Sequence, residues 1–209
     1  MTVKLNIAFY SLYGHVYKLA QALKEGAEKV DGVEVTLTQI AETLPEEVLT
    51  LMHAPPKPDV PIFNPADLPN YDGYLFGIPT RYGNSPAQWR AFWDHTGGLW
   101  AKGALVGKVA GTFFSTASQH GGQETTALTF LTTLAHHGIT YVPFGYTHPA
   151  LTDNTEVVGG SAYGAGTIAG GDGSRQPTEK ELAIAMAQGE SFARRLVQYT
   201  PKGKEPSKV

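Results

Sequence analysis

One stretch of the sequence decides the fold: residues 3–39 read VKLNIAFYSLYGHVYKLAQALKEGAEKVDGVEVTLTQ. Residues 3–10 are mostly apolar and predict a strand, and apolar side chains then recur at helical spacing over residues 16–30. An Asp-Gly pair ends that helix, and residues 33–39 alternate apolar and polar side chains like a second strand. A strand, a helix and a strand in succession form a βαβ unit, which implies a parallel sheet with helices on its faces.

Strands and helices continue to alternate beyond a proline-rich segment, residues 41–70, which permits one short helix at 46–52 and otherwise loop. Further strands are expected at residues 73–79, at 108–115 and from Thr140, and further helices at 85–93, 125–137 and 178–196. Thr178 and Glu181 fit the capping box that opens the last helix. The glycine-rich stretch 159–173 is expected to be a loop.

Five strands that alternate with helices predict one doubly wound α/β domain over residues 1–200. It would have three layers, α/β/α, around a five-stranded parallel sheet with the flavodoxin-like strand order. Residues 201–209 are expected to form a disordered tail.

Composition excludes several classes of function. The formal net charge is -3, which offers no electrostatic footprint for nucleic acid or for an anionic membrane surface. The chain has no cysteine, so disulfides, thiolate metal sites and a cysteine nucleophile are excluded, and redox chemistry would need a bound cofactor. We find no signal peptide and no membrane-spanning stretch, and we expect a cytoplasmic protein. Its histidines do not show a metal-ligand spacing, so no metal is expected.

Three polar loops follow expected strands, where open α/β sheets bind their ligands. Residues 11–16 combine hydroxyls and a glycine with the start of a helix and favour a phosphate, although a turn with a serine cap is an equal alternative. Residues 79–85 bring hydrogen-bonding groups and an aromatic ring, and residues 115–124 are again small and polar. Each loop alone could be an ordinary solvated turn, but the three together predict a phosphate-bearing planar ligand.

Five segments in order resemble the WrbA family of flavodoxin-like NAD(P)H:quinone oxidoreductases. They are Ser11–His15, Pro79–Asn84, Thr96–Trp100, Thr133–Gly138 and Ala169–Pro177. The resemblance runs from about Val3 to Tyr199 and implies non-covalent FMN, NADH or NADPH as co-substrate, quinones as acceptors and a homotetramer built as a dimer of dimers. An aromatic-rich surface around Trp89–Trp100 is the candidate interface.

The resemblance also implies roles for single residues. It assigns FMN binding to Ser11, Leu12, Tyr13, Gly14, His15, Val16, Pro79, Thr80, Arg81, Tyr82, Gly83, Asn84, Ser115, Thr116, Ala117, Ser118, Gln119, His120, Gly121 and His136. Tyr13 would also contact the nicotinamide nucleotide, Trp100 would pack over the substrate, and His136 would be catalytic at the flavin. The stretch 117–120 departs from the glycine-richer loop of the family.

The function expected is a two-electron reduction of quinones by NAD(P)H through FMN, with both substrates using one flavin face in a ping-pong mechanism. The alternative is an FMN-binding electron carrier or regulatory protein without turnover of its own. A serine hydrolase is a weaker reading, because the run from Gly159 to Tyr163 lacks the second glycine of a nucleophile elbow. Trp100 could instead belong to the core, and His136 could instead only cap the end of its helix. If His136 is functional, substitution of its neighbour His137 is expected to have almost no effect.

Overall fold

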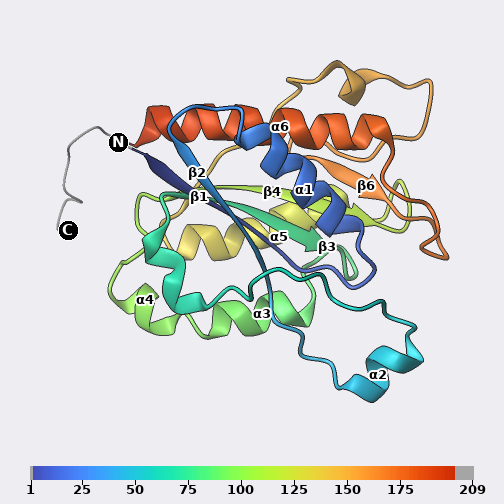
Figure 1. Ribbon diagram of the computed structural model, residues 1–209, viewed down its shortest axis with the longest axis horizontal. Coiled ribbons are helices and arrows are strands. Elements are labelled where there is room, and N and C mark those ends of the chain that lie inside the picture. The colour runs from blue at the N-terminus through green and yellow to red at the C-terminus, as the bar shows by residue number, and fades with distance from the viewer. Residues whose placement is uncertain (1, 201–209) are drawn as a thin grey trace.

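A parallel sheet with the strand order β2-β1-β3-β4-β5 forms the centre of the computed structural model, which describes residues 2–200 (Figure 1). The strands are β1 (Val3–Phe9), β2 (Val33–Gln39), β3 (Gly73–Pro79), β4 (Val109–Thr116), β5 (Thr140–Tyr141) and β6 (Gly166–Ile168). This is the flavodoxin-like order, and the predicted fold class is confirmed. The expected tail, residues 201–209, lies outside the described residues.

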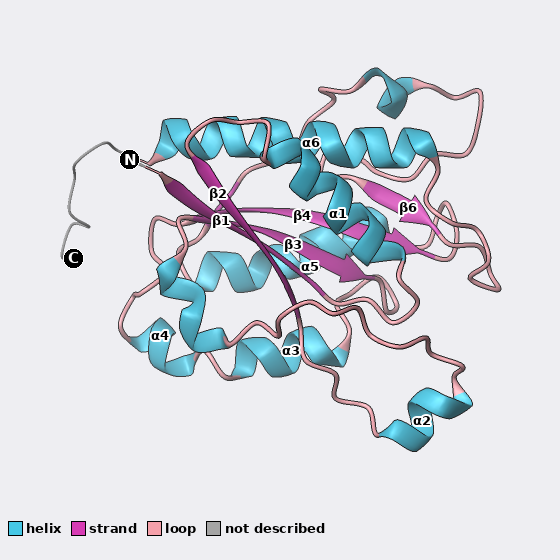
Figure 2. Cartoon of the chain, viewed as in Figure 1, coloured by secondary structure: helices cyan, strands magenta, loops and turns pink. Residues whose placement is uncertain are grey.

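Helices cover both faces of the sheet in three layers (Figure 2). They are α1 (His15–Ala27), α2 (Glu46–Leu51), α3 (Ala87–Asp94), α4 (Gly97–Ala101), α5 (Gln123–His136) and α6 (Glu179–Tyr199), with 3₁₀ turns η1 (Pro65–Asn70) and η2 (Pro149–Thr152). Helices α1 and α6 bury their apolar residues on one face, and α3 and α5 bury theirs on the other. None of the helices in the described part of the chain is long and apolar enough to span a membrane.

The fifth position of the sheet differs from the sequence prediction. Strand β5 ends at Tyr141, two residues before Pro143. Strand β6 then pairs in parallel with the later part of β4, next in line after β5. Val109 pairs with Thr140 at one end of β4, and Phe114 pairs with Gly166 at the other. The glycine-rich stretch therefore contains a short strand instead of being loop throughout. The sequence does not reveal this strand because only three of its residues pair with β4, too few to produce a recognisable pattern.

The aromatic residues of α3 do not form the exposed patch expected from the sequence. Trp89 is fully buried, Trp93 is nearly so, and both pack with Phe76 and Phe130 in edge-to-face contacts. Trp100 in α4 is the reverse case: it is 58% exposed, so the alternative that it belongs to the core is wrong. Aromatic content alone could not separate the buried face of α3 from the surface.

Helices α1 and α6 cross with their backbones in direct contact. A Cβ atom at Gly26 would lie 1.9 Å from the Met186 carbonyl oxygen, and one at Gly189 would lie 2.0 Å from the Leu23 carbonyl oxygen. These distances leave no room for any side chain, so both positions require glycine for the helices to approach.

We expect Gly189→Ala to lower the free energy of unfolding by about 1–3 kcal/mol, because α1 and α6 must separate to admit the methyl group. The matched control is Gly98→Ala in α4, where a Cβ would meet nothing within 4 Å. Urea unfolding followed by circular dichroism measures both. Equal stability of the two variants would contradict the close approach.

Candidate active site

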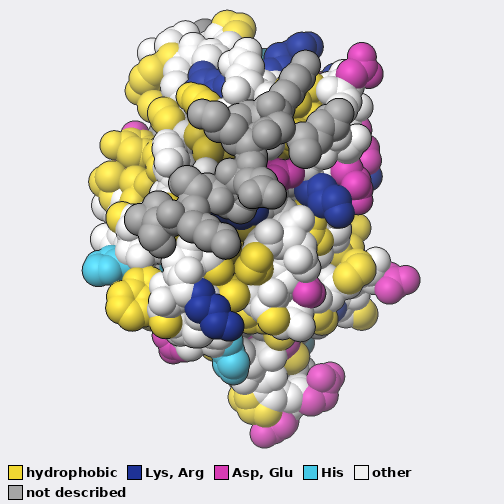
Figure 3. Space-filling view, turned by 90° about the vertical axis from the view of Figure 1, so that its left-hand side faces the viewer, with side chains coloured by type: hydrophobic (Ala, Val, Ile, Leu, Met, Phe, Trp, Pro, Cys, Tyr) yellow, Lys and Arg dark blue, Asp and Glu magenta, His cyan; other side chains and the backbone are white. Residues whose placement is uncertain are grey.

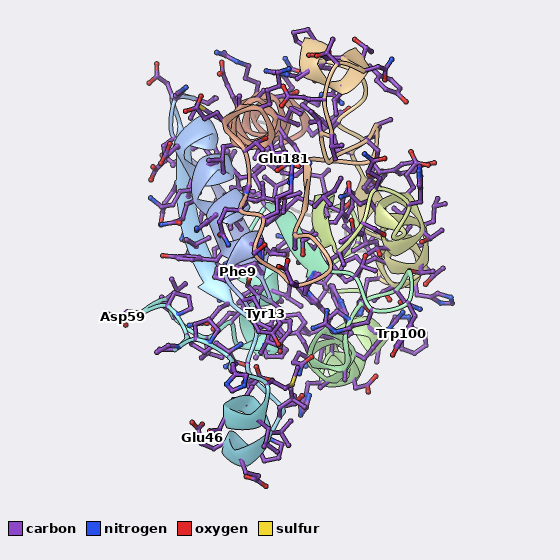
Figure 4. All side chains as sticks on the ribbon, turned by 90° about the vertical axis from the view of Figure 1, so that its right-hand side faces the viewer. Phe9, Tyr13, Glu46, Asp59, Trp100 and Glu181 are labelled. Atoms are coloured by element: carbon purple, nitrogen blue, oxygen red, sulfur yellow. The ribbon has the colours of Figure 1, made fainter. Side chains whose placement is uncertain are left out.

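The three loops predicted to bind a ligand come together at one edge of the sheet. The register aligns β1 with β3 and β3 with β4, so Phe9 lies beside Gly77 and Gly77 beside Phe113. The carboxyl ends of these strands therefore open on the same side, the edge that faces the viewer in Figure 4. There Tyr13 lies between Phe9 and the segment of residues 43–56 that carries α2 and Glu46, here called the α2 arm (Figure 4). Parallel pairing thus produces the candidate site.

The first loop leaves the amino end of α1 open. Gly14 precedes the helix with a φ of 87°, and no side chain caps the helix there. The first N–H groups of a helix have no partner within it, and the first turn of α1 carries no acidic residue. A Cβ at Gly14 would meet nothing within 4 Å. Free N–H donors beside open space fit a phosphate group.

Buried His15 borders this opening. Its Nε2 lies 3.0 Å from the Arg175 carbonyl oxygen, to which it donates. Burial lowers the pKa of His15, so the ring is held neutral near pH 7. Arg175 is in turn fixed by Glu181, whose carboxylate is fully buried and also accepts from the Gly159 and Thr178 N–H groups. The capping box predicted for Thr178 and Glu181 is confirmed, and Glu181 has this second role besides.

The second loop is a tight hairpin at the end of β3. The backbones of Arg81 and Asn84 exchange two hydrogen bonds of 2.8 and 3.0 Å. Tyr82 and Gly83 between them have φ values of 54° and 73°, the positive angles of a type I′ turn. The turn leaves the Tyr82 ring fully exposed, although tyrosine rarely adopts this backbone conformation. The Asn84 side chain accepts from Arg90 and from its own neighbour, so it serves the loop itself.

The third loop follows β4 and leads into α5. Ser115 and Thr116 are buried, and Thr116 Oγ1 donates to the Ser118 carbonyl oxygen and accepts from Gln123. The stretch from Ala117 to His120 is exposed, so its atoms are free to contact a bound flavin ring.

Two helix N-termini open on this edge, and their surroundings differ in charge. The α5 terminus has Glu124 in its first turn and borders a cavity of about 690 Å³ that Asp153 and Glu156 also line. The α1 terminus has no carboxylate in its first turn. A phosphate therefore fits α1 and not α5.

Residues that the sequence analysis did not single out hold the first loop in place. Glu42 accepts from the Tyr10 hydroxyl, from Lys57 and from Gln88. Lys57 also donates to the Ser11 carbonyl oxygen at 3.1 Å. Nothing in the sequence marks Glu42 and Lys57, because both stand in the proline-rich segment and meet only in the folded chain.

Trp100 and His136 lie at the opposite edge of the sheet from the three loops. Helix α5 runs back along β4, from Gln123 beside Thr116 to the turn at Gly138 beside Gly107. Its 14 residues span about 20 Å. Helix α4 lies on the left in Figure 1, the side that Figure 3 shows from the front, where hydrophobic side chains reach the surface. Within one chain, neither residue reaches a ligand held at Ser11–Val16.

The sequence analysis expects substitution of His137 to have almost no effect, but the structure gives His137 a buried hydrogen bond. His136 is exposed, whereas His137 is buried and its Nε2 lies 2.9 Å from Thr96 Oγ1. The Thr96 hydroxyl donates its one proton to the Trp93 carbonyl oxygen at 2.6 Å. His137 must therefore donate from Nε2. Burial and the neighbouring His136 lower the pKa of His137 and favour this neutral form.

A 2-1-3-4-5 sheet with an uncapped helix N-terminus after β1 and polar loops after β3 and β4 is typical of flavodoxin-like flavin-binding proteins. The model of the family described as NADPH-dependent FMN reductase matches residues 11–148, and the chain belongs to this family. Membership confirms the expected oxidoreductase chemistry and the pairing of FMN with a nicotinamide nucleotide.

Curated relatives are similar over nearly the whole chain. The chain is 58% identical over 196 residues to NAD(P)H quinone oxidoreductase PST2 of Candida albicans, covering 94% of this chain and 97% of that protein. It is 58% identical over 190 residues to quinone-oxidoreductase QR2 of Triphysaria versicolor, covering 90% and 93%.

Solved structures show the same fold at lower identity. A WrbA-like flavodoxin from Agrobacterium tumefaciens has a TM-score of 0.64 at 23% identity, covering 95% of this chain and all of that one. Oxidised Flavodoxin 1 from Bacillus cereus has a TM-score of 0.56 at 18% identity, covering 95% and 99%.

We expect His137→Asn to lower the free energy of unfolding by about 1–3 kcal/mol at pH 8, because the shorter amide cannot reach Thr96 and leaves buried polar atoms unpaired. His136→Asn should change it by less than about 0.5 kcal/mol. The folded pKa of His137 is lowered, so acid favours the unfolded state in the wild type. The stability gap between wild type and His137→Asn should therefore shrink from pH 8 to pH 5. Urea titrations at both pH values measure this, and a gap that widens in acid would contradict the neutral His137.

Proposed function

We propose that this chain is an FMN-dependent NAD(P)H:quinone oxidoreductase of the WrbA type. The observation that carries the proposal is the uncapped amino end of α1, bordered by neutral His15 and by the hydroxyl-rich ends of β3 and β4. The curated relatives named as quinone oxidoreductases support the reaction. The cytoplasmic location expected from the sequence stays a prediction.

The loops divide the binding of FMN between them. The N–H groups of residues 11–16 would hold the phosphate, while Thr80–Tyr82 and Ser115–Gly121 would line the ring. Pro79 and Gly83 shape the second loop, Pro79 as a buried residue at the end of β3 and Gly83 as the second turn position. Bound FMN supplies the hydride acceptor and the two-electron donor that the protein's own side chains lack.

Tyr13 is placed to meet the second substrate. Its ring is 44% exposed at this edge, and its hydroxyl donates to the Met52 carbonyl oxygen at the end of α2. An exposed ring held at its far end offers a fixed flat surface to a nicotinamide or a quinone. The nicotinamide and the quinone are both flat and would use the same face of the flavin, so they would bind one after the other.

Trp100 and His136 would act from a neighbouring subunit. Both are exposed at the edge opposite the loops, so a second copy must present them if they are to meet the flavin. A closed homotetramer, a dimer of dimers, would allow this for every site. The His136 imidazole would then be placed to donate a proton during reduction of the quinone.

Initial rates measured with both NAD(P)H and benzoquinone varied should give the parallel lines of ping-pong kinetics. NADH and NADPH should be compared on the FMN-loaded protein. Intersecting lines would contradict a shared ring face, and the absence of turnover would favour an electron carrier or a regulatory protein.

Light scattering should show a homotetramer, and His136→Asn should lose quinone turnover while keeping its thermal stability. Mixing the subunits of His136→Asn with those of a second inactive variant, Tyr13→Ala, should restore part of the turnover, because mixed assemblies contain intact sites. A stable, fully active monomer would contradict the proposed contribution of a second subunit.

A further inference from the structure

A half-buried carboxylate, Glu42, organises the two ends of the α2 arm. Glu42 stands before the arm and accepts five hydrogen bonds: from the Tyr10 hydroxyl at 2.9 Å, from Lys57 at 2.8 Å, from Gln88 at 2.8 Å and from the N–H groups of Thr43 and Leu44. Burial by itself raises the pKa of Glu42, but these donors outweigh it and lower the pKa to about 2. Glu42 is therefore ionised throughout the neutral range.

Lys57 connects this carboxylate to the first loop. Its ammonium group lies 2.8 Å from Glu42 Oε2, 3.1 Å from the Ser11 carbonyl oxygen and 4.7 Å from the centre of the Tyr10 ring. A carboxylate, a carbonyl and an aromatic face surround the charge on three sides. Lys57 thus holds the Ser11–Leu12 peptide, which lies in the first loop just beyond the end of β1.

Fixing the Ser11 carbonyl also fixes the N–H group that follows it. The peptide between Ser11 and Leu12 is planar and trans, so its N–H points opposite to its carbonyl. The Leu12 N–H is thereby turned away from Lys57, and it finds no acceptor within residues 2–200. It joins the free donors at the start of α1.

We propose that Lys57, anchored by Glu42, is a positioning residue that orients the first loop for the phosphate of the flavin and so makes the site select FMN over riboflavin. This inference rests on the proposed phosphate site at residues 11–16. Lys57 acts through the Ser11 peptide, and its charge is already paired with Glu42.

A purely electrostatic role would look different, and Lys18 provides the comparison. Lys18 lies in the first turn of α1, is exposed, and donates a hydrogen bond to the Gln176 side chain. Its charge is close to the same helix terminus, but it does not hold the loop backbone. Attraction at a distance would make the two lysines similar, whereas positioning makes Lys57 alone important.

The test is titration of the full-length apoprotein with FMN and, separately, with riboflavin. Lys57→Met should raise the Kd for FMN by roughly tenfold or more while changing the Kd for riboflavin less than about threefold. Glu42→Gln should act in the same direction, because its amide replaces an acceptor by a donor. Lys57→Arg should retain the preference for FMN, and Lys18→Met should change either Kd less than about threefold. Thermal unfolding of each variant separates loss of fold from loss of selectivity.

The outcomes separate this inference from the function on which it rests. If the wild type prefers FMN but Lys57→Met keeps that preference, Lys57 has no positioning role and the phosphate site stands. An equal loss in Lys18→Met and Lys57→Met would show simple charge attraction and overturn the inference. If the wild type binds FMN and riboflavin equally, the phosphate site at residues 11–16 is itself wrong. If it binds neither, the flavin-dependent function is wrong.

Discussion

Close backbone packing around Gly77 is the constraint on which the site depends. Gly77 lies at the centre of the sheet, between Phe9 and Phe113, and a Cβ there would come within 2.5 Å of the Phe113 ring and 2.7 Å of the Val16 side chain. Its carbonyl oxygen accepts from the Tyr10 N–H and from the Trp89 indole. One glycine thus lets β1, β3, β4, α1 and α3 meet, and these elements carry the three loops.

Two carboxylates then hold the first loop: Glu42, which is half-buried, and Glu181, which is fully buried. Glu42 acts through Lys57 on Ser11, and Glu181 acts through Arg175 on His15. Removing a carboxylate from water costs free energy that only a full set of donors offsets, and each of these two has such a set. The same donors come from segments distant in sequence, so the loop keeps its shape only when the whole fold is in place.

The direction of α5 separates His136 from the three loops that follow β1, β3 and β4. A helix that links parallel strands must run back against them, which carries His136 to the edge where the strands begin. The loops after β1, β3 and β4 stay at the other edge. The proposed role of His136 at the flavin therefore requires a second copy of the chain, because the direction of α5 keeps His136 away from the three loops.

The sequence by itself determined the fold class, the order of the elements and the three strand-end loops. Apolar periodicity and the Asp-Gly stop fixed the βαβ unit, and Thr178 with Glu181 marked the start of α6, since these signals lie within a few residues of one another. Only the tertiary structure decided which tryptophans are buried, that β6 continues the fifth position, that His137 is the structural member of its pair, and that Glu42 meets Lys57 beside Ser11. Each of these depends on segments that are far apart along the chain and become neighbours only when the sheet and its covering helices are assembled.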